Sequence, residues 1–284
     1  MTQARLLGAT LLGLATLLGP GGGEVARAAA PAGPATQPAA TQPAATQPAP
    51  LARPSPAPPP RAALRVSWKV DLPVTLALGA TWVTTDALES RLGPSRCRWC
   101  EPNLNGLDAA GRDARWSRTG TADTLSNVTA YGLVPAVSFG LVSWDAWREG
   151  GWRQAAMDDL VIFESMVVSA VLVQGLKYSF ARKRPYVRDL PPGSPLSGEA
   201  NLSFPSGHTA FAFSLATAAG TVATLRGYRS APYVWGAGMA LAAFTGYLRM
   251  AADKHYASDV IVGALTGSLV GWAVPYLIHR RWRR

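Results

Sequence analysis

Six apolar stretches of helix length dominate the sequence from residue 64 onward and limit what this chain can fold into. They are rich in Ala, Leu, Val and Gly, and they lack the alternation of polar and apolar residues that marks strands. Turn-forming clusters such as Glu149-Gly150-Gly151 and Arg226-Gly227-Tyr228 separate them. The pattern predicts an all-α bundle of about six helices. The stretches cover residues 72–88, 125–144, 160–176, 209–225, 232–248 and 260–278.

These stretches are near the lower length limit for crossing a bilayer, and several contain Ser, Thr or an acid such as Asp86 or Glu164. An ionisable group within a span normally faces the bundle interior. Glu164 could equally be the partner of an arginine in a soluble helical core, so both arrangements stay open. We expect the bundle to be membrane-embedded or membrane-associated.

Two N-terminal segments differ in composition from the rest of the chain. Residues 1–28 have the features of a secretory signal peptide, because Arg5 precedes a short apolar run and Ala26-Arg27-Ala28 is a suitable cleavage site. Residues 29–63 are rich in Ala, Pro, Thr and Gln, which predicts a disordered tether that cannot form a core. We therefore expect an exported chain whose functional domain covers residues 64–284.

A cleaved signal peptide conflicts with six membrane crossings. The mature chain would begin outside the cytoplasm, and six crossings would place the basic C-terminus outside as well, whereas the positive-inside rule favours the cytoplasm. Either the signal is not cleaved and the number of spans is not six, or some helices are peripheral and the domain is largely periplasmic.

The formal net charge of +10 does not indicate nucleic-acid binding, because the arginines are scattered and form no continuous stripe. A basic tail beside an apolar segment is more typical of a chain that contacts an anionic membrane surface.

Cys97 and Cys100 could form a local disulfide or remain free thiols. No second cysteine pair or nearby histidine accompanies them, so we expect no structural metal there. We also expect no cofactor.

Three clusters of polar residues stand at the ends of the apolar stretches. Lys177 closes the third stretch, and Arg184 follows seven residues later, two helical turns on, before Pro185 stops the helix. This spacing predicts two cations aimed at one anion. A solvated basic helix end would look the same if it were considered alone.

The second cluster is Pro205-Ser206-Gly207-His208, directly before the fourth stretch. Ser206 is a natural N-cap, Gly207 allows an anion to approach the backbone amides, and helix N-termini bind anions. His208 would place a proton donor beside that anion.

The third cluster holds His255 and Asp259, four residues apart on one face of the helix that begins the sixth stretch. The carboxylate can hold Nδ1 of the imidazole and leave the Nε2 lone pair as a nucleophile. Arg249, at the end of the fifth stretch, can fold back as a third cation.

Together the clusters resemble the type 2 phosphatidic acid phosphatase (PAP2) superfamily, which includes bacterial acid phosphatases and vanadium haloperoxidases. The family pattern is K-x6-RP, then PSGH, then SR-x5-H-x3-D, and this chain departs from it only at Leu248, where serine is usual. The resemblance covers about residues 64–279 and implies a helical bundle and metal-independent chemistry. It further implies that His255 attacks phosphorus and forms a phosphohistidine, that Asp259 orients it, and that His208 protonates the leaving oxygen and later activates water. Phosphate would be bound by Lys177, Arg184, Ser206, the amide of Gly207 and Arg249.

The expected activity is hydrolysis of a phosphate monoester or diphosphate, most readily of a lipid of the phosphatidic acid or polyprenyl diphosphate type, at the periplasmic side. Alternatives are a periplasmic non-specific acid phosphatase acting on small phosphate esters, a vanadate-dependent haloperoxidase, and an anion-binding protein without turnover. The Pro-, Gly- and Ser-rich residues 190–202, between the first two clusters, are the expected substrate-facing loop.

Overall fold

The computed structural model describes residues 63–281. The chain divides into two units, Met1–Ser55 and Pro56–Arg284, and all the described residues belong to the second. The expected signal peptide (1–28) and nearly all of the expected tether (29–63) lie outside the described residues.

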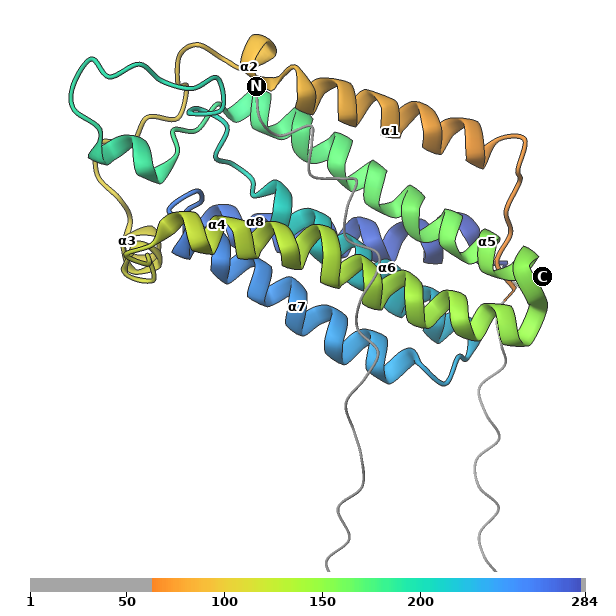
Figure 1. Ribbon diagram of the computed structural model, residues 1–284. Helices are drawn as coiled ribbons and strands as arrows, with labels where there is room; N and C mark the ends of the chain where they lie inside the picture. Colours follow the sequence, from red (N-terminus) through yellow and green to blue (C-terminus); the bar gives the residue numbers. More distant parts are fainter. Residues whose placement is uncertain (1–62, 282–284) are drawn as a thin grey trace, which may run out of the picture. The chain divides into compact units, whose positions relative to one another are not determined.

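The second unit is all-α, as predicted, and residues 63–281 contain only two isolated β-bridges. The long helices are α1 (Asp71–Ala87), α4 (Thr119–Val128), α5 (Val134–Phe180), α6 (Gly207–Arg226), α7 (Ala231–Ala251) and α8 (Ala257–Ala273) (Figure 1). The short elements are α2 (Glu89–Leu92), α3 (Gly106–Asp113) and the 3-10 turn η2 (Pro185–Asp189). Two π-helical turns complete the set: η1 (Thr129–Leu133) joins α4 to α5, and η3 (Val274–His279) continues α8.

The six predicted apolar stretches correspond to six long helical segments. Residues 125–144 lie in a continuous segment formed by α4, η1 and the first half of α5. Gly151 interrupts α5 with φ 73° and ψ −171°, a conformation that L residues with a side chain rarely adopt. The predicted turn at Glu149-Gly150-Gly151 is therefore confirmed, and the second half of α5 carries residues 160–176.

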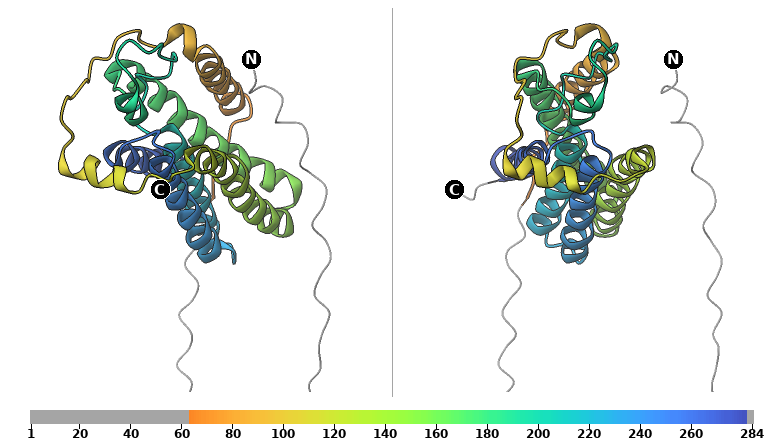
Figure 2. Two further views of the ribbon diagram at one scale, coloured as in Figure 1. Left: turned by 60° about the vertical axis from the view of Figure 1, so that its left-hand side comes forward. Right: turned by 90° about the vertical axis from the view of Figure 1, so that its left-hand side faces the viewer.

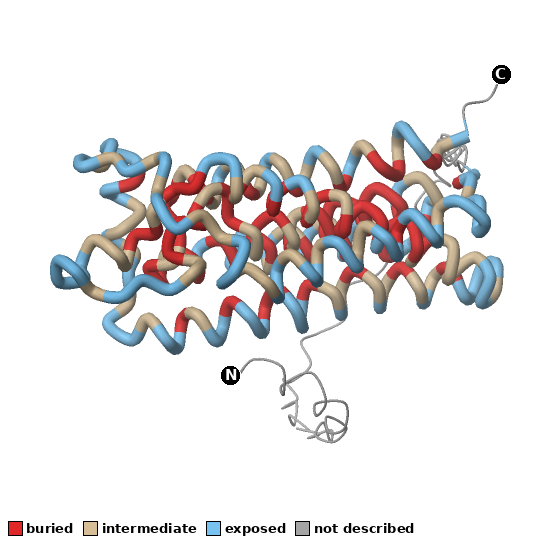
Figure 3. Tube along the Cα trace, turned by 90° about the horizontal axis from the view of Figure 1, so that it is seen from above, coloured by how far each residue is buried: buried red, intermediate tan, exposed pale blue. Residues whose placement is uncertain are grey.

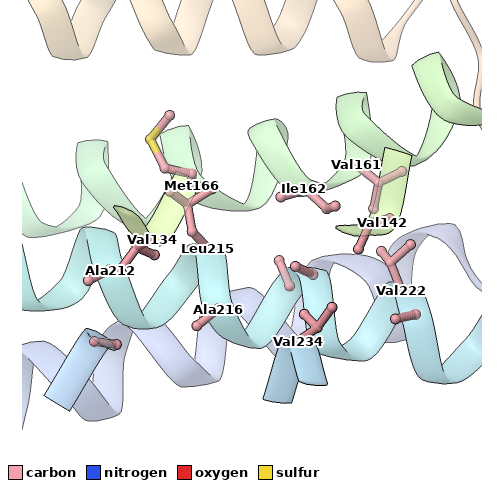
Figure 4. Close-up of a cluster of buried hydrophobic side chains, with 14 of the residues drawn as sticks. Val134, Val142, Val161, Ile162, Met166, Ala212, Leu215, Ala216, Val222 and Val234 are labelled. Carbon is pink, nitrogen blue, oxygen red and sulfur yellow. The ribbon is translucent and has the colours of Figure 1, made fainter. Parts of the chain in front are cut away.

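Helix α6 lies at the centre of the bundle and packs against α5, α7 and α8, whereas α1 packs along the second half of α5 (Figures 1 and 2). Buried residues concentrate along the inner faces of these helices (Figure 3). The core between α5, α6 and α7 is mainly aliphatic, and part of it is shown in Figure 4. It includes Val142, Ile162, Met166, Leu215, Val222 and Val234.

Three glycines spaced four residues apart bring α8 close to α6. A Cβ atom on Gly263, Gly267 or Gly271 would lie 2.6, 2.3 or 2.5 Å from a backbone oxygen of α6 or its N-cap. Such distances are too short for any side chain, so the two backbones are in direct contact. This contact sets the N-terminus of α8 beside the N-terminus of α6.

The start and the end of the described chain meet at one end of the bundle. Leu64 and Arg280 form an antiparallel bridge, and the Arg65 amide donates to the His279 carbonyl at 2.7 Å. His279 is 2% exposed, with Nδ1 2.7 Å from the Arg65 carbonyl and Nε2 3.2 Å from Glu164. Its role is therefore structural.

Among the described residues, one helical segment, Ala257–His279, is long and apolar enough to cross a membrane. Large apolar side chains are also exposed along its outer face: Ile261, Leu265, Leu269, Trp272, Leu277 and Ile278.

Candidate active site

Four helix ends meet at the end of the bundle opposite the paired termini: the C-termini of α5 and α7 and the N-termini of α6 and α8. A Cβ atom on Gly207 would lie 3.4 Å from Nζ of Lys177, which joins the first and second clusters. The Ser206 amide donates to the Asp259 carbonyl at 3.0 Å, which joins the second and third. The structure thus brings the three sequence clusters together.

The first cluster differs from its prediction in backbone conformation. Helix α5 ends at Phe180 because Ala181 adopts a left-handed conformation with φ 46°, so Arg184 lies in an extended segment and not two helical turns beyond Lys177. Arg184 is 3% exposed and its Nε donates to the Glu199 carbonyl at 2.9 Å. Its Nη1 is buried with no hydrogen-bond partner among the described residues.

Arg249 lies in the last turn of α7, as predicted, and is 3% exposed. Its Nη1 donates to Asp123 at 2.5 Å and to the Ser126 hydroxyl at 2.9 Å. Its Nε, like Nη1 of Arg184, is buried without an acceptor among the described residues. Buried donors normally have partners, so these two N–H groups are suited to the oxygens of a bound anion.

At the second cluster, Ser206 occupies the N-cap position of α6, but its hydroxyl pairs with that of Thr209 at 2.9 Å and does not cap the backbone. His208 is the second residue of α6. Its Nε2 lies 2.7 Å from Oδ1 of Asn127, and its ring lies 4.9 Å from that of Tyr131. Neither Asn127 nor Tyr131 was predicted, because both come from a distant part of the sequence.

At the third cluster, His255 precedes α8 and does not share a helix face with Asp259, because Tyr256 is the N-cap. Nδ1 of His255 lies 2.7 Å from the Ser203 carbonyl and 3.7 Å from Asp259, so the predicted direct hydrogen bond to the carboxylate is replaced by one to the backbone. Donation from Nδ1 to this carbonyl leaves the Nε2 lone pair available. Burial, followed by the charges of Arg184, Arg249 and Lys177, lowers the pKa of His255 well below its ordinary value.

The Asp259 carboxylate contacts groups that the sequence did not reveal. Its Oδ1 accepts from Arg182 at 2.5 Å, and its Oδ2 accepts from the Ser203 hydroxyl at 2.5 Å and the Tyr256 amide at 2.9 Å. Arg182 lies inside the first sequence cluster, but in an arginine-rich chain nothing local distinguishes it from surface charge.

The loop over residues 190–202 reaches the site through Glu199, whose carboxylate lies 3.1 Å from Arg184 and 3.9 Å from Lys254.

Cys97 and Cys100 form a disulfide, which is one of the two alternatives left open by the sequence. No group of three or more His, Cys, Asp or Glu residues suited to a metal ion occurs within residues 63–281.

The candidate site combines two histidines with two buried guanidinium groups on an all-α bundle. Residues 160–283, which hold all three clusters of the candidate site, match the model of the PAP2 superfamily. A lipid A 1-phosphatase from Porphyromonas gingivalis is 36% identical over 124 residues, which are 44% of this chain and 24% of that protein. This chain therefore spans about a quarter of that relative's length.

Two solved structures are also similar to this chain. A transmembrane PAP2-type phosphatidylglycerolphosphate phosphatase from Bacillus subtilis has 16% identity and a TM-score of 0.43, covering 70% of this chain and 93% of its own. LpxE from Aquifex aeolicus has 26% identity and a TM-score of 0.42, covering 61% of this chain and 96% of its own.

Proposed function

We propose that this protein is a metal-independent phosphatase that hydrolyses a phosphorylated lipid through a phosphohistidine on His255. The observation that carries the proposal is the pair of buried guanidinium N–H groups, on Arg184 and Arg249, that have no acceptor among the described residues. A phosphoryl group supplies the oxygens that such donors require.

In the proposed reaction, Nε2 of His255 attacks phosphorus, and the bond from phosphorus to the ester oxygen breaks. His208 gives a proton to the departing oxygen. Water then attacks the phosphohistidine, His208 takes a proton from that water, and inorganic phosphate leaves with His255 restored. Lys177, Arg184, Arg249 and the amide of Gly207 stabilise the charge on the phosphoryl group in both steps.

A lipid substrate is supported by the apolar outer face of Ala257–His279 and by the name of the Porphyromonas gingivalis relative, a lipid A 1-phosphatase. A bundle that lies in the membrane presents its site to lipid headgroups at the surface. We further propose that the site faces the periplasm.

The test is phosphate release in detergent and EDTA from lipid A, phosphatidic acid and p-nitrophenyl phosphate, with His255→Ala as the control. We expect release from a lipid that is lost in the variant, while the thermal unfolding of the variant stays near that of the wild type. Release mainly from the small ester would favour a non-specific acid phosphatase. Release from none of the three would contradict the proposal.

A further inference from the structure

Arg182 is a buried arginine that does not belong to the predicted phosphate site. It is 2% exposed, and its guanidinium bridges two carboxylates from separate helices. Nη1 donates to Asp259 of α8 at 2.5 Å, and Nη2 donates to Asp108 of α3 at 2.6 Å. Both carboxylates are fully buried, so each depends on this one cation for its neutralisation.

Two aromatic rings enclose the Arg182 guanidinium. Its central carbon lies 4.2 Å from the centre of the Trp99 ring and 4.3 Å from that of Tyr256. Trp99 lies within the loop closed by the Cys97–Cys100 disulfide, and its carbonyl accepts from the Lys183 amide at 3.4 Å. The disulfide loop therefore helps to hold Arg182 in place.

The contacts of Asp259 connect Arg182 to His255. With Oδ1 held by Arg182 and Oδ2 held by Ser203 and Tyr256, the carboxylate stays 3.7 Å from Nδ1 of His255. Nδ1 instead contacts the Ser203 carbonyl at 2.7 Å. Without Arg182, a buried carboxylate lacking a counter-ion would gain most by moving onto the nearby imidazole.

A carboxylate against the imidazole would favour the protonated ring, in which Nε2 has no free lone pair. We propose that Arg182 is a positioning residue of the active site: it holds Asp259 away from Nδ1, so that His255 stays on the Ser203 carbonyl as a neutral imidazole. This inference rests on the proposed function for its catalytic consequence. The other charged or titratable groups that act on His255 are Lys177, Arg184, Arg249 and His208.

The test uses Arg182→Met in the full chain, with Lys183→Met as a matched control that removes a neighbouring charge. The first readout is the NMR titration of the His255 imidazole, identified by its loss in His255→Gln. The second is kcat and KM for p-nitrophenyl phosphate. We expect His255 of Arg182→Met to titrate at higher pH than in the wild type, kcat to fall about 10–100-fold, and KM to change little, because the phosphate-binding cations are untouched.

The inference would be overturned if His255 of Arg182→Met titrated as in the wild type and kcat were unchanged. If Arg182→Met does not fold, Arg182→Lys is the second test, because lysine keeps the positive charge but cannot bridge both carboxylates. A titration of His255 that lies between those expected for the wild type and Arg182→Met supports the inference. A His255 titration and a kcat equal to those of the wild type overturn it. Because the titration needs no turnover, absence of phosphatase activity in the wild type would contradict the proposed function separately.

Discussion

Arg184 and Arg249 each hold a carboxylate with part of the guanidinium and keep another N–H without an acceptor among the described residues. Asp123 and Glu199 thereby offset some of the repulsion between cations that lie close together. Arg184 also lowers the pKa of Glu199, as the largest contribution to that shift. The same two cations lower the pKa of His255, and this shift should be visible in the pH dependence of the reaction rate.

Replacing Arg184 by Gln removes a positive charge near His255, so the pKa of His255 rises toward its ordinary value. The proposed nucleophile, His255, is active when neutral, and the acid limb of kcat/KM should therefore move to higher pH. We also expect kcat to fall about 100–1000-fold, because a proposed ligand of the phosphoryl group is lost. A pH–rate profile checks this, with exposed Arg91→Gln as the control. An acid limb unchanged in Arg184→Gln would contradict the electrostatic account.

At the scale of elements, the contact between α6 and α8 depends on residues without side chains. Gly267→Ala would place a Cβ 2.3 Å from the Ala210 carbonyl oxygen. We expect it to destabilise the fold by about 1–3 kcal/mol and to reduce activity by moving the two helix N-termini apart. Gly236→Ala is the matched control, because a Cβ there meets nothing within 4 Å. Equal unfolding temperatures in detergent for the two variants would rule out direct backbone contact.

The sequence predicted the six helical segments and the residues of the three clusters, because apolar periodicity and motif spacing are local properties. It did not predict that α5 ends at Phe180, because that end depends on the left-handed conformation of Ala181. It also did not predict that His255 lies before α8, because that start depends on Tyr256 acting as the N-cap. The roles of Arg182 and Asn127 depend on contacts between distant segments, which no local pattern records.

At the scale of the whole unit, the described termini and the candidate site lie at opposite ends of the bundle. Leu64 pairs with Arg280 at one end, whereas α1 ends beside the C-terminus of α5, where the Tyr178 hydroxyl donates to the Thr85 carbonyl at 2.9 Å. A periplasm-facing site in a spanning bundle therefore places Leu64 and Arg280 on the cytoplasmic side. A signal peptide cleaved outside the membrane would place them on the other side.

Single cysteines test this arrangement. We expect a membrane-impermeant maleimide to label Asp113→Cys, at the site end, in intact spheroplasts, and to label Arg229→Cys, in the loop between α6 and α7, only after lysis. The native cysteines are joined in a disulfide and do not compete. The reverse pattern would agree with a cleaved signal peptide and contradict a periplasm-facing site. Labelling of both would contradict a spanning bundle.

The most direct test of the central claim is to trap the phosphorylated histidine with radiolabelled p-nitrophenyl phosphate. The p-nitrophenolate group leaves without a proton, so His208→Gln should still form the intermediate but hydrolyse it slowly. We predict that acid-sensitive, alkali-stable label accumulates on His255 in His208→Gln and is absent from His255→Gln. Label on another residue, or label that persists in His255→Gln, would contradict the account.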